Sequence, residues 1–154
     1  MGDPVIVSPS KLILAVSLTF SLFLPTASAE GASALIETSE TIRTVTVEVA
    51  DTPQTRATGL MFHPPLGEER GMYFLFPSLG PQIFWMKNVP FALDILFIGA
   101  DGTIVSITKN APPCAEEPCP LYRSGKPIVA ALELRGGWCD KYGVREGGKV
   151  EYRP

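Results

Sequence analysis

The stretch ALDILFIGADGTIVSITK, residues 92–109, decides the fold. Its two apolar runs, residues 92–98 and 103–109, flank an Asp101–Gly102 pair, which favours the tight turn of a β-hairpin. In the first run apolar side chains fall on both faces of the predicted strand, which is typical of a central strand buried on both sides. The stretch therefore predicts an antiparallel hairpin inside a sheet.

The segments on either side of this hairpin continue the β pattern. Residues 41–51, TIRTVTVEVAD, alternate between valine and polar side chains, as in a half-buried strand. Further strands are predicted at residues 72–77, 83–88 and 128–135 and within 144–152, and short helices within 51–61 and 136–143. The sequence thus predicts a mainly β single domain over residues 43–154, a compact antiparallel β-barrel or sandwich-like fold with two short helices.

Composition and charge limit the classes of function. The chain has 154 residues, of which 45% are hydrophobic and 19% are charged, and this balance suits one globular domain. The net charge is −3, with Lys and Arg scattered along the chain, whereas a nucleic-acid groove needs a basic stripe. We therefore expect no nucleic-acid partner.

Residues 1–29 have the pattern of a cleaved signal peptide. Lys11 precedes an apolar run at residues 12–24, and residues 27–29, Ala-Ser-Ala, supply the small side chains that a signal peptidase reads before Glu30. The run is shorter than the roughly 20 residues that cross a bilayer comfortably. An uncleaved membrane anchor is the alternative.

Cleavage would leave no membrane span and would export the protein, to the periplasm in a Gram-negative source. Residues 30–42 are small and polar in their first part, and we expect them to form a flexible leader before the domain.

The chain has three cysteines, Cys114, Cys119 and Cys139. In an oxidising compartment Cys114 and Cys119 can close a small loop, which makes a structural disulfide the favoured interpretation over a metal site or a reactive thiol pair. The spacing does not fit a zinc knuckle, and the single histidine, His63, lies far away in sequence. We expect neither a metal nor a cofactor. The Pro-rich segment 110–127 around this pair is predicted to be a long loop.

Two carboxylates fall on predicted strands. Asp94 lies in the apolar central strand, where an unpaired charge would be costly, so it needs a cation such as Lys87, several hydrogen bonds, or a proton. It is either a structural group or a pocket carboxylate with a shifted pKa. Glu133 lies beside the small side chains of Val129 and Ala131, which leaves room for a ligand or for water. Together, Asp94 and Glu133 are candidates for an acid/base pair of the glycosidase kind.

Four further residues are candidates for ligand contacts. Trp85 can stack on a sugar or a peptide, or simply pack in the core. Lys87 and Arg56 can steady negative charge, and Asn88 can donate and accept hydrogen bonds. The candidate ligand-binding residues are therefore Arg56, Trp85, Lys87, Asn88, Asp94 and Glu133.

The order of several short motifs resembles the bacterial and archaeal family known as domain of unknown function 192. The motifs are VEVADTPQTRATGLM, GMYFLF, FWMKN, LDILFIGADG, APPC with PCPLY, and ALEL with GW, between about residues 43 and 152. The resemblance implies a small β-rich domain, often exported, and no established activity. Its pattern marks Arg56, Gly59, Leu60, Met61, Gly71, Met72, Phe84, Trp85, Met86, Asn88, Asp94 and Glu133.

This chain departs from the family pattern at three positions. Similar chains often read Asn-Thr-x-x-Pro-Leu-Asp, where this one has Val89 and Ala92, so a hydroxyl contact and a rigid bend are absent from the motif. Cys139 stands where a small residue such as Ala is common, which suits a buried side chain that does not react.

Three functions compete on these observations. The favoured one is a monomeric accessory module of the cell envelope, with a pocket near Trp85, Asn88 and Asp94 for a small polar ligand, a glycan or a partner protein. The second is a small hydrolase or lyase that uses Asp94 and Glu133 as acid and base. The third is a purely structural interaction protein, which would expose an apolar patch.

Overall fold

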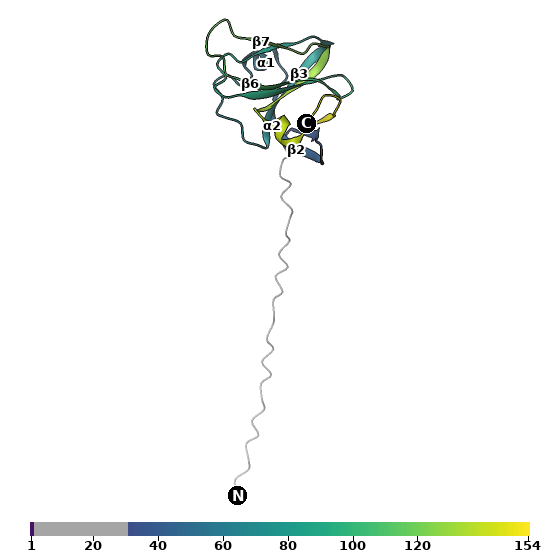
Figure 1. The fold of residues 1–154 in the computed structure, drawn as a ribbon. Helices are drawn as coiled ribbons and strands as arrows, with labels where there is room; N and C mark the ends of the chain where they lie inside the picture. The colour runs from purple at the N-terminus through teal and green to yellow at the C-terminus, as the bar shows by residue number, and fades with distance from the viewer. Residues whose placement is uncertain (2–30) are drawn as a thin grey trace.

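The computed structural model describes Met1 and residues 31–154, so the predicted signal peptide lies, apart from Met1, outside the described residues. One sheet has seven strands in the order β6-β5-β8-β3-β2-β1-β9, and β4 pairs with β7 in a second, small sheet (Figure 1). The strands are β1 (Ser33–Glu37), β2 (Ile42–Ala50), β3 (Arg70–Gly80), β4 (Ile83–Trp85), β5 (Leu93–Ile98), β6 (Ile104–Ala111), β7 (Leu121–Arg123), β8 (Ile128–Arg135) and β9 (Val150–Arg153). The predicted mainly β fold with two short helices, α1 (Pro53–Thr58) and α2 (Trp138–Tyr142), is confirmed.

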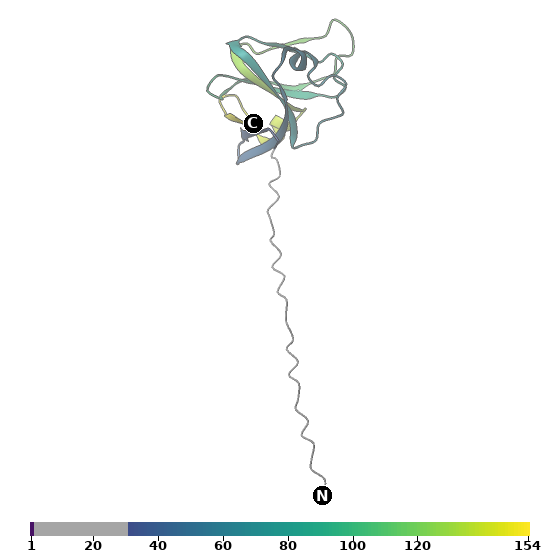
Figure 2. The same cartoon turned by 180° about the vertical axis from the view of Figure 1, so that it is seen from behind.

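The large sheet curls into a half-barrel. Its pairings are antiparallel except for β2 with β3, which run parallel. The edge strands β6 and β9 approach each other at one end, where Thr103 and Lys149 form a bridge and the N–H of Val150 donates to the carbonyl of Gly102 at 2.9 Å. Figures 1 and 2 show the curled sheet from its two sides.

Each face of the sheet carries its own apolar core. The inner core lies on the side of Leu96 and Leu132 and gathers side chains from most strands of the half-barrel. The outer core lies on the side of Ile95 and Phe97 and is covered by the segment that follows α1 and by β4 and the loop after it. All six residues of β5 are buried, so the prediction of a central strand with two buried faces is confirmed.

The expected leader at residues 30–42 is wrong for the segment that forms β1. Ala34 and Ile36 are fully buried in the inner core, and β1 pairs with β2 on one side and with β9 on the other. The alternating pattern of SALIE, residues 33–37, is too short to predict a strand among small polar neighbours. The strand forms because it is buried between β2 and β9.

Helix α1, which the sequence predicts within residues 51–61, is set by its ends. The Thr52 hydroxyl accepts a hydrogen bond from the N–H of Thr55 at 3.0 Å, and the Thr52 N–H donates to the Thr55 hydroxyl at 3.0 Å, which forms a reciprocal cap. Pro53 occupies the first turn, and Gly59 ends the helix with a φ of 47°. The helix places Arg56 in its last turn.

Three other boundaries differ from the prediction. β3 continues past Pro77 to Gly80, and a register shift against β8 between Leu75 and Gly80 accommodates the proline. β4 stops at Trp85, because the chain turns at Asn88, which has a φ of 57°. The predicted loop 110–127 contains a short strand, β7, which pairs with β4. No helix among the described residues is long and apolar enough to cross a membrane.

Candidate functional site

A cleft lies between α1 and β4, over the outer core. Its outer part has a volume of about 470 Å³, within the usual range for small-molecule sites. Its inner chamber is much smaller, about 30 Å³, which holds a water molecule or one small polar group. The two parts share Arg56, Ala57, Phe74, Phe84 and Trp85 as lining residues, so they lie next to each other, and we call them together the cleft.

Glu133 lies at the inner end of the cleft. It belongs to β8, between Met72 of β3 and Ile95 of β5, and only 4% of its surface is exposed. Its carboxyl group makes no hydrogen bond or ion pair to residues 31–154. Every fully buried side-chain oxygen in this range has a hydrogen-bond partner, so the Glu133 oxygens are not fully buried. They open onto the chamber that Glu133 lines. Burial raises the pKa of Glu133 to about 8, and the group is therefore protonated at neutral pH.

Arg56 lines both parts of the cleft and is anchored at one edge. Its Nη1 donates to the carbonyls of Asp51 and Leu75, the latter at 2.8 Å, and its guanidinium lies 5.9 Å from the centre of the Phe76 ring. These bonds fix the side chain between α1 and β3 and occupy one of its nitrogens. The other two guanidinium nitrogens make no hydrogen bond or ion pair to residues 31–154.

Aromatic side chains form the walls of the cleft. Phe84 is buried and meets Phe74 and Phe97 edge to face, at centroid distances of 5.2 and 5.6 Å. Trp85, the next residue on β4, points to the opposite side of the strand and is 46% exposed. It also lines both parts of the cleft, and its exposure excludes the core packing that was one of its two predicted roles.

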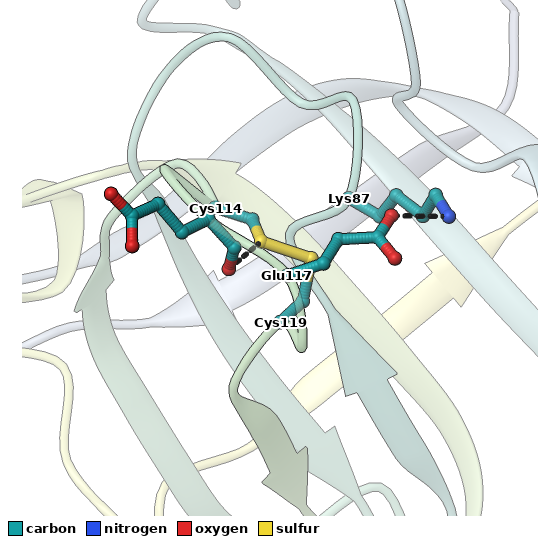
Figure 3. The surroundings of a disulfide bond; sticks show 5 residues. Lys87, Cys114, Glu117 and Cys119 are labelled. Atoms are coloured by element: carbon teal, nitrogen blue, oxygen red, sulfur yellow. Dashed lines mark hydrogen bonds and ion pairs between the residues drawn. A yellow bond between two sulfur atoms is a disulfide. The ribbon is translucent and has the colours of Figure 1, made fainter.

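Lys87 stands beside Trp85, and the disulfide loop neutralises its charge. Its ammonium lies 5.4 Å from the centre of the Trp85 ring and 2.6 Å from the carboxylate of Glu117 (Figure 3). Glu117 lies within the small loop closed by the disulfide of Cys114 and Cys119, which confirms that predicted pairing. Of the alternatives predicted for Asp94, a cation such as Lys87 is therefore excluded.

Asp94 is a structural anion on the other face of the sheet. It is fully buried, and its two oxygens accept three backbone N–H bonds, from Asn110 at 2.7 Å, Gly137 at 3.0 Å and Cys139 at 2.7 Å. These bonds tie the end of β6 and the start of α2 to the central strand. Of the two roles predicted for Asp94, the structure supports the structural one.

The predicted acid/base pair is not assembled. In the β5–β8 register, Asp94 stands opposite Leu134 and Glu133 opposite Ile95, so the two carboxyl groups project from opposite faces of the sheet. A substrate bound on one face of the sheet cannot contact both carboxyl groups. The hypothesis of a hydrolase or lyase with Asp94 and Glu133 as acid and base is therefore wrong.

Asn88 serves the backbone, and it does not line the cleft. Its φ of 57° is one that few residues adopt readily, and asparagine is among those few. Its carbonyl accepts the N–H of Phe62 at 2.8 Å, which joins the segment after α1 to the segment after β4. Of the six predicted ligand-binding residues, the cleft thus brings together Arg56, Trp85, Lys87 and Glu133.

Cys139 is buried beside Asp94 and is not part of the disulfide. Burial first, and then the charge of Asp94, raises the pKa of the Cys139 thiol well above its usual range. The thiol stays protonated at neutral pH and is a poor nucleophile. Among the residues described here, no group of three or more His, Cys, Asp or Glu side chains is placed to hold a metal ion.

A second hollow of about 270 Å³ lies near the start of β2, beside Glu68 and Tyr142. Its polar groups already bind one another: Lys141 and Tyr142 both donate to the Glu68 carboxylate and lower its pKa, and Arg43 lies over the Tyr142 ring. Such a self-paired set leaves little for a ligand, whereas Glu133 and Arg56 in the cleft keep unused hydrogen-bonding groups.

The sequence did not single out two of the phenylalanines of the cleft, Phe74 and Phe76, as site residues. Phe74 and Phe76 lie in the run MYFLFP, which predicts a strand but gives no sign that one end lines a cleft. Their role depends on how α1 and β4 are placed over the sheet.

The fold and the cleft define a small curled β domain, and comparison with known proteins assigns it to a family. The chain belongs to the family of uncharacterised proteins known as domain of unknown function 192 (DUF192), which matches residues 34–152. This confirms the resemblance seen in the sequence motifs. No curated protein matches the chain.

Two crystal structures show the same fold. A protein of Sinorhizobium meliloti, described as a candidate transcription regulator, is 34% identical, with 81% of this chain and 96% of that chain covered and a TM-score of 0.73. A protein of unknown function from Novosphingobium aromaticivorans is also 34% identical, with 77% of this chain and 83% of that chain covered and a TM-score of 0.73.

Proposed function

We propose that this protein is an exported binding module of the cell envelope that holds a small ligand in the cleft between α1 and β4. Glu133 forms the inner end of the site, Arg56 one wall, and Trp85 and Lys87 its mouth. The observation that carries the proposal is the Glu133 carboxyl group, which is nearly buried, unpartnered and open to the chamber.

An unpartnered buried carboxyl group lowers the stability of a fold, because burial removes its hydration and nothing replaces it. Asp94 and Glu133 are both buried, but Asp94 accepts three hydrogen bonds and Glu133 accepts none. A fold that satisfies one carboxylate fully and leaves another facing a chamber supports a binding role for the second.

The cleft favours binding over hydrolysis. It holds a single buried carboxyl group, and no serine or cysteine nucleophile lines its inner chamber. The net charge of −3 does not favour a nucleic-acid partner, although the Sinorhizobium protein is described as a candidate transcription regulator.

A partner protein is the second candidate occupant, and a specific surface favours it. Ile83 and Trp85 of β4 and Leu121 of β7 are each about half exposed, and Trp85 pairs directly with Leu121. This apolar face borders the mouth of the cleft, so an extended segment of a partner could cover it and reach inward.

The two tryptophans provide the test. Trp85 stands at the mouth of the cleft, whereas the Trp138 ring is 3% exposed and its indole N–H donates to the Glu68 carbonyl at 2.8 Å. We would label both indoles for NMR and screen small polar compounds, oligosaccharides and peptides. A ligand of the cleft is expected to move the Trp85 signal and leave Trp138 in place.

The matched variant is Glu133→Gln, which keeps the size of the side chain and its ability to donate a hydrogen bond. It is expected to change the affinity of a ligand that reaches the chamber. The proposal is contradicted if no compound of the panel moves the Trp85 signal. It is also contradicted if the affinity of a ligand is the same in Glu133→Gln, in Trp85→Ala and in the native protein.

A further inference from the structure

The polar groups of the cleft specify a ligand class, given that the proposed binding function holds. We infer that the cleft takes a small monocarboxylate with an apolar body, whose carboxylate meets Arg56 and the Glu133 carboxyl group while the body lies along the aromatic walls. Each part of this assignment comes from a different group in the cleft.

Arg56 supplies the positive charge. It makes no ion pair with any carboxylate of residues 31–154, and two guanidinium nitrogens remain unused by its bonds to the carbonyls of Asp51 and Leu75. A guanidinium with a free edge matches the planar, two-oxygen geometry of a carboxylate. The bonds that anchor Arg56 also hold this edge in place before a ligand arrives.

Lys87 does not add a second free charge. Its ammonium is paired with the Glu117 carboxylate at 2.6 Å, and the disulfide of Cys114 and Cys119 closes the loop that carries Glu117. The cleft therefore presents one unbalanced positive charge, which suits a ligand with one negative charge better than a phosphate dianion or a cation.

Glu133 supplies a hydrogen-bond donor when it is protonated. Arg56 and Lys87 are the charged groups that line the chamber with it, and its neighbours across the sheet, Met72 and Ile95, are apolar. Burial raises the pKa of Glu133 to about 8, so at neutral pH the carboxyl group can donate to a ligand carboxylate. Above that pH the two negative charges would repel each other.

The walls supply the apolar contact. Phe74, Phe76, Phe84 and Trp85 surround the outer cleft together with Ile83, and its volume of about 470 Å³ exceeds what a bare carboxylate needs. An aromatic or short aliphatic body would bury its apolar surface there and remove it from water, which favours binding.

The experiment titrates the labelled protein with phenylacetate and with phenylacetamide, which has nearly the same shape and no charge, and follows the Trp85 and Trp138 indole signals. Phenylacetate is expected to move Trp85 alone and to bind about tenfold more tightly than the amide. Its affinity is expected to fall about tenfold between pH 6.5 and pH 9.5, because Glu133 loses its proton over that interval.

Variants separate the parts of the inference. Arg56→Gln is expected to remove the preference for the carboxylate, and Glu133→Gln to remove the pH dependence while keeping the preference. Arg123→Gln, an exposed arginine of β7 that does not line the cleft, is the matched control and is expected to change neither. Circular dichroism of each variant checks that the fold is intact.

Three results would overturn the inference. Equal binding of acid and amide would show that the cleft binds ligands but does not select a carboxylate. Inorganic phosphate that displaces phenylacetate at equal concentration would show that any anion suffices. Absence of binding by both probes rejects the monocarboxylate class, whereas the proposed binding function fails only if the full compound panel is also silent.

Discussion

Asp94 and Glu133 stand on hydrogen-bonded neighbouring strands, one position apart in register, and their carboxyl groups leave the sheet through opposite faces. Asp94 enters the inner core and accepts three backbone N–H bonds. Glu133 faces the cleft and accepts none. Two acidic residues that look equivalent in the sequence therefore differ in role: one holds the fold together through three hydrogen bonds, and the other makes none within residues 31–154.

The Asp94→Asn substitution should lower the free energy of unfolding by about 3 kcal/mol, because the amide turns a donor toward N–H groups that need an acceptor. Urea unfolding at pH 7 measures this loss. Asp140→Asn is the control, since Asp140 is 69% exposed and pairs only with Lys109, and its loss should stay below about 1 kcal/mol. Equal losses in the two variants would refute the structural role of Asp94.

The stability of the native protein should fall between about pH 5 and pH 8. Burial raises the pKa of Glu133 from its ordinary value near 4.5 to about 8, so over this window the unfolded chain releases a proton that the folded chain keeps. The loss from this group is about 1.4 kcal/mol per pH unit at most and stops above pH 8.

Glu133→Gln removes this titration, so the variant should have a flatter pH profile and should be the more stable protein at pH 8. Chemical unfolding at several pH values measures both quantities. Glu151→Gln, an exposed residue of β9, is the matched control and should keep the native slope. A native-like slope in Glu133→Gln would mean that other groups cause the pH dependence.

Gly71→Ala should destabilise the protein by about 2 kcal/mol or more, because a Cβ at this position would stand 2.8 Å from the backbone carbonyl oxygen of Glu133, which cannot move without breaking the sheet. Gly80→Ala in the same strand is the control, since a Cβ there would meet nothing within 4 Å. Thermal unfolding of both variants compares them directly, and similar melting temperatures would show that β3 and β8 can separate at little cost.

Replacing Cys114 and Cys119 together by Ser should cost about 2 kcal/mol, the loop-entropy value for a loop this short. Unfolding in urea with and without a thiol reductant measures the same quantity in the native protein. The double variant should not respond to the reductant, because the remaining thiol, Cys139, is buried and unpaired. A response in the double variant would assign the effect to another cause.

The sequence predicts the parts of this protein that depend on local patterns. Apolar side chains on both faces of residues 93–98 predict the doubly buried strand, and residues 51–61 predict the short helix α1. The sequence also supplies Arg56, Trp85, Lys87 and Glu133 as candidates without showing that they share one cleft. The parts it misses depend on contacts between distant segments.

Asn88 illustrates this limit. A polar residue between apolar neighbours is a reasonable ligand candidate, but its backbone angle and its bond to Phe62 explain the asparagine without a ligand. Likewise, the N–H groups that donate to Asp94 belong to Asn110, Gly137 and Cys139, at sequence separations of 16 to 45 residues. A local sequence pattern cannot predict hydrogen bonds between such distant residues.

The position of β1 has a consequence for how the chain folds. β1 lies between β2 and β9, so a strand near residue 35 must wait for residues 150–153 before its second edge is paired. A sheet closed by such distant partners loses much chain entropy before its contacts form, and domains of this kind fold slowly. The half-barrel is therefore completed only after residues 150–153 have become available.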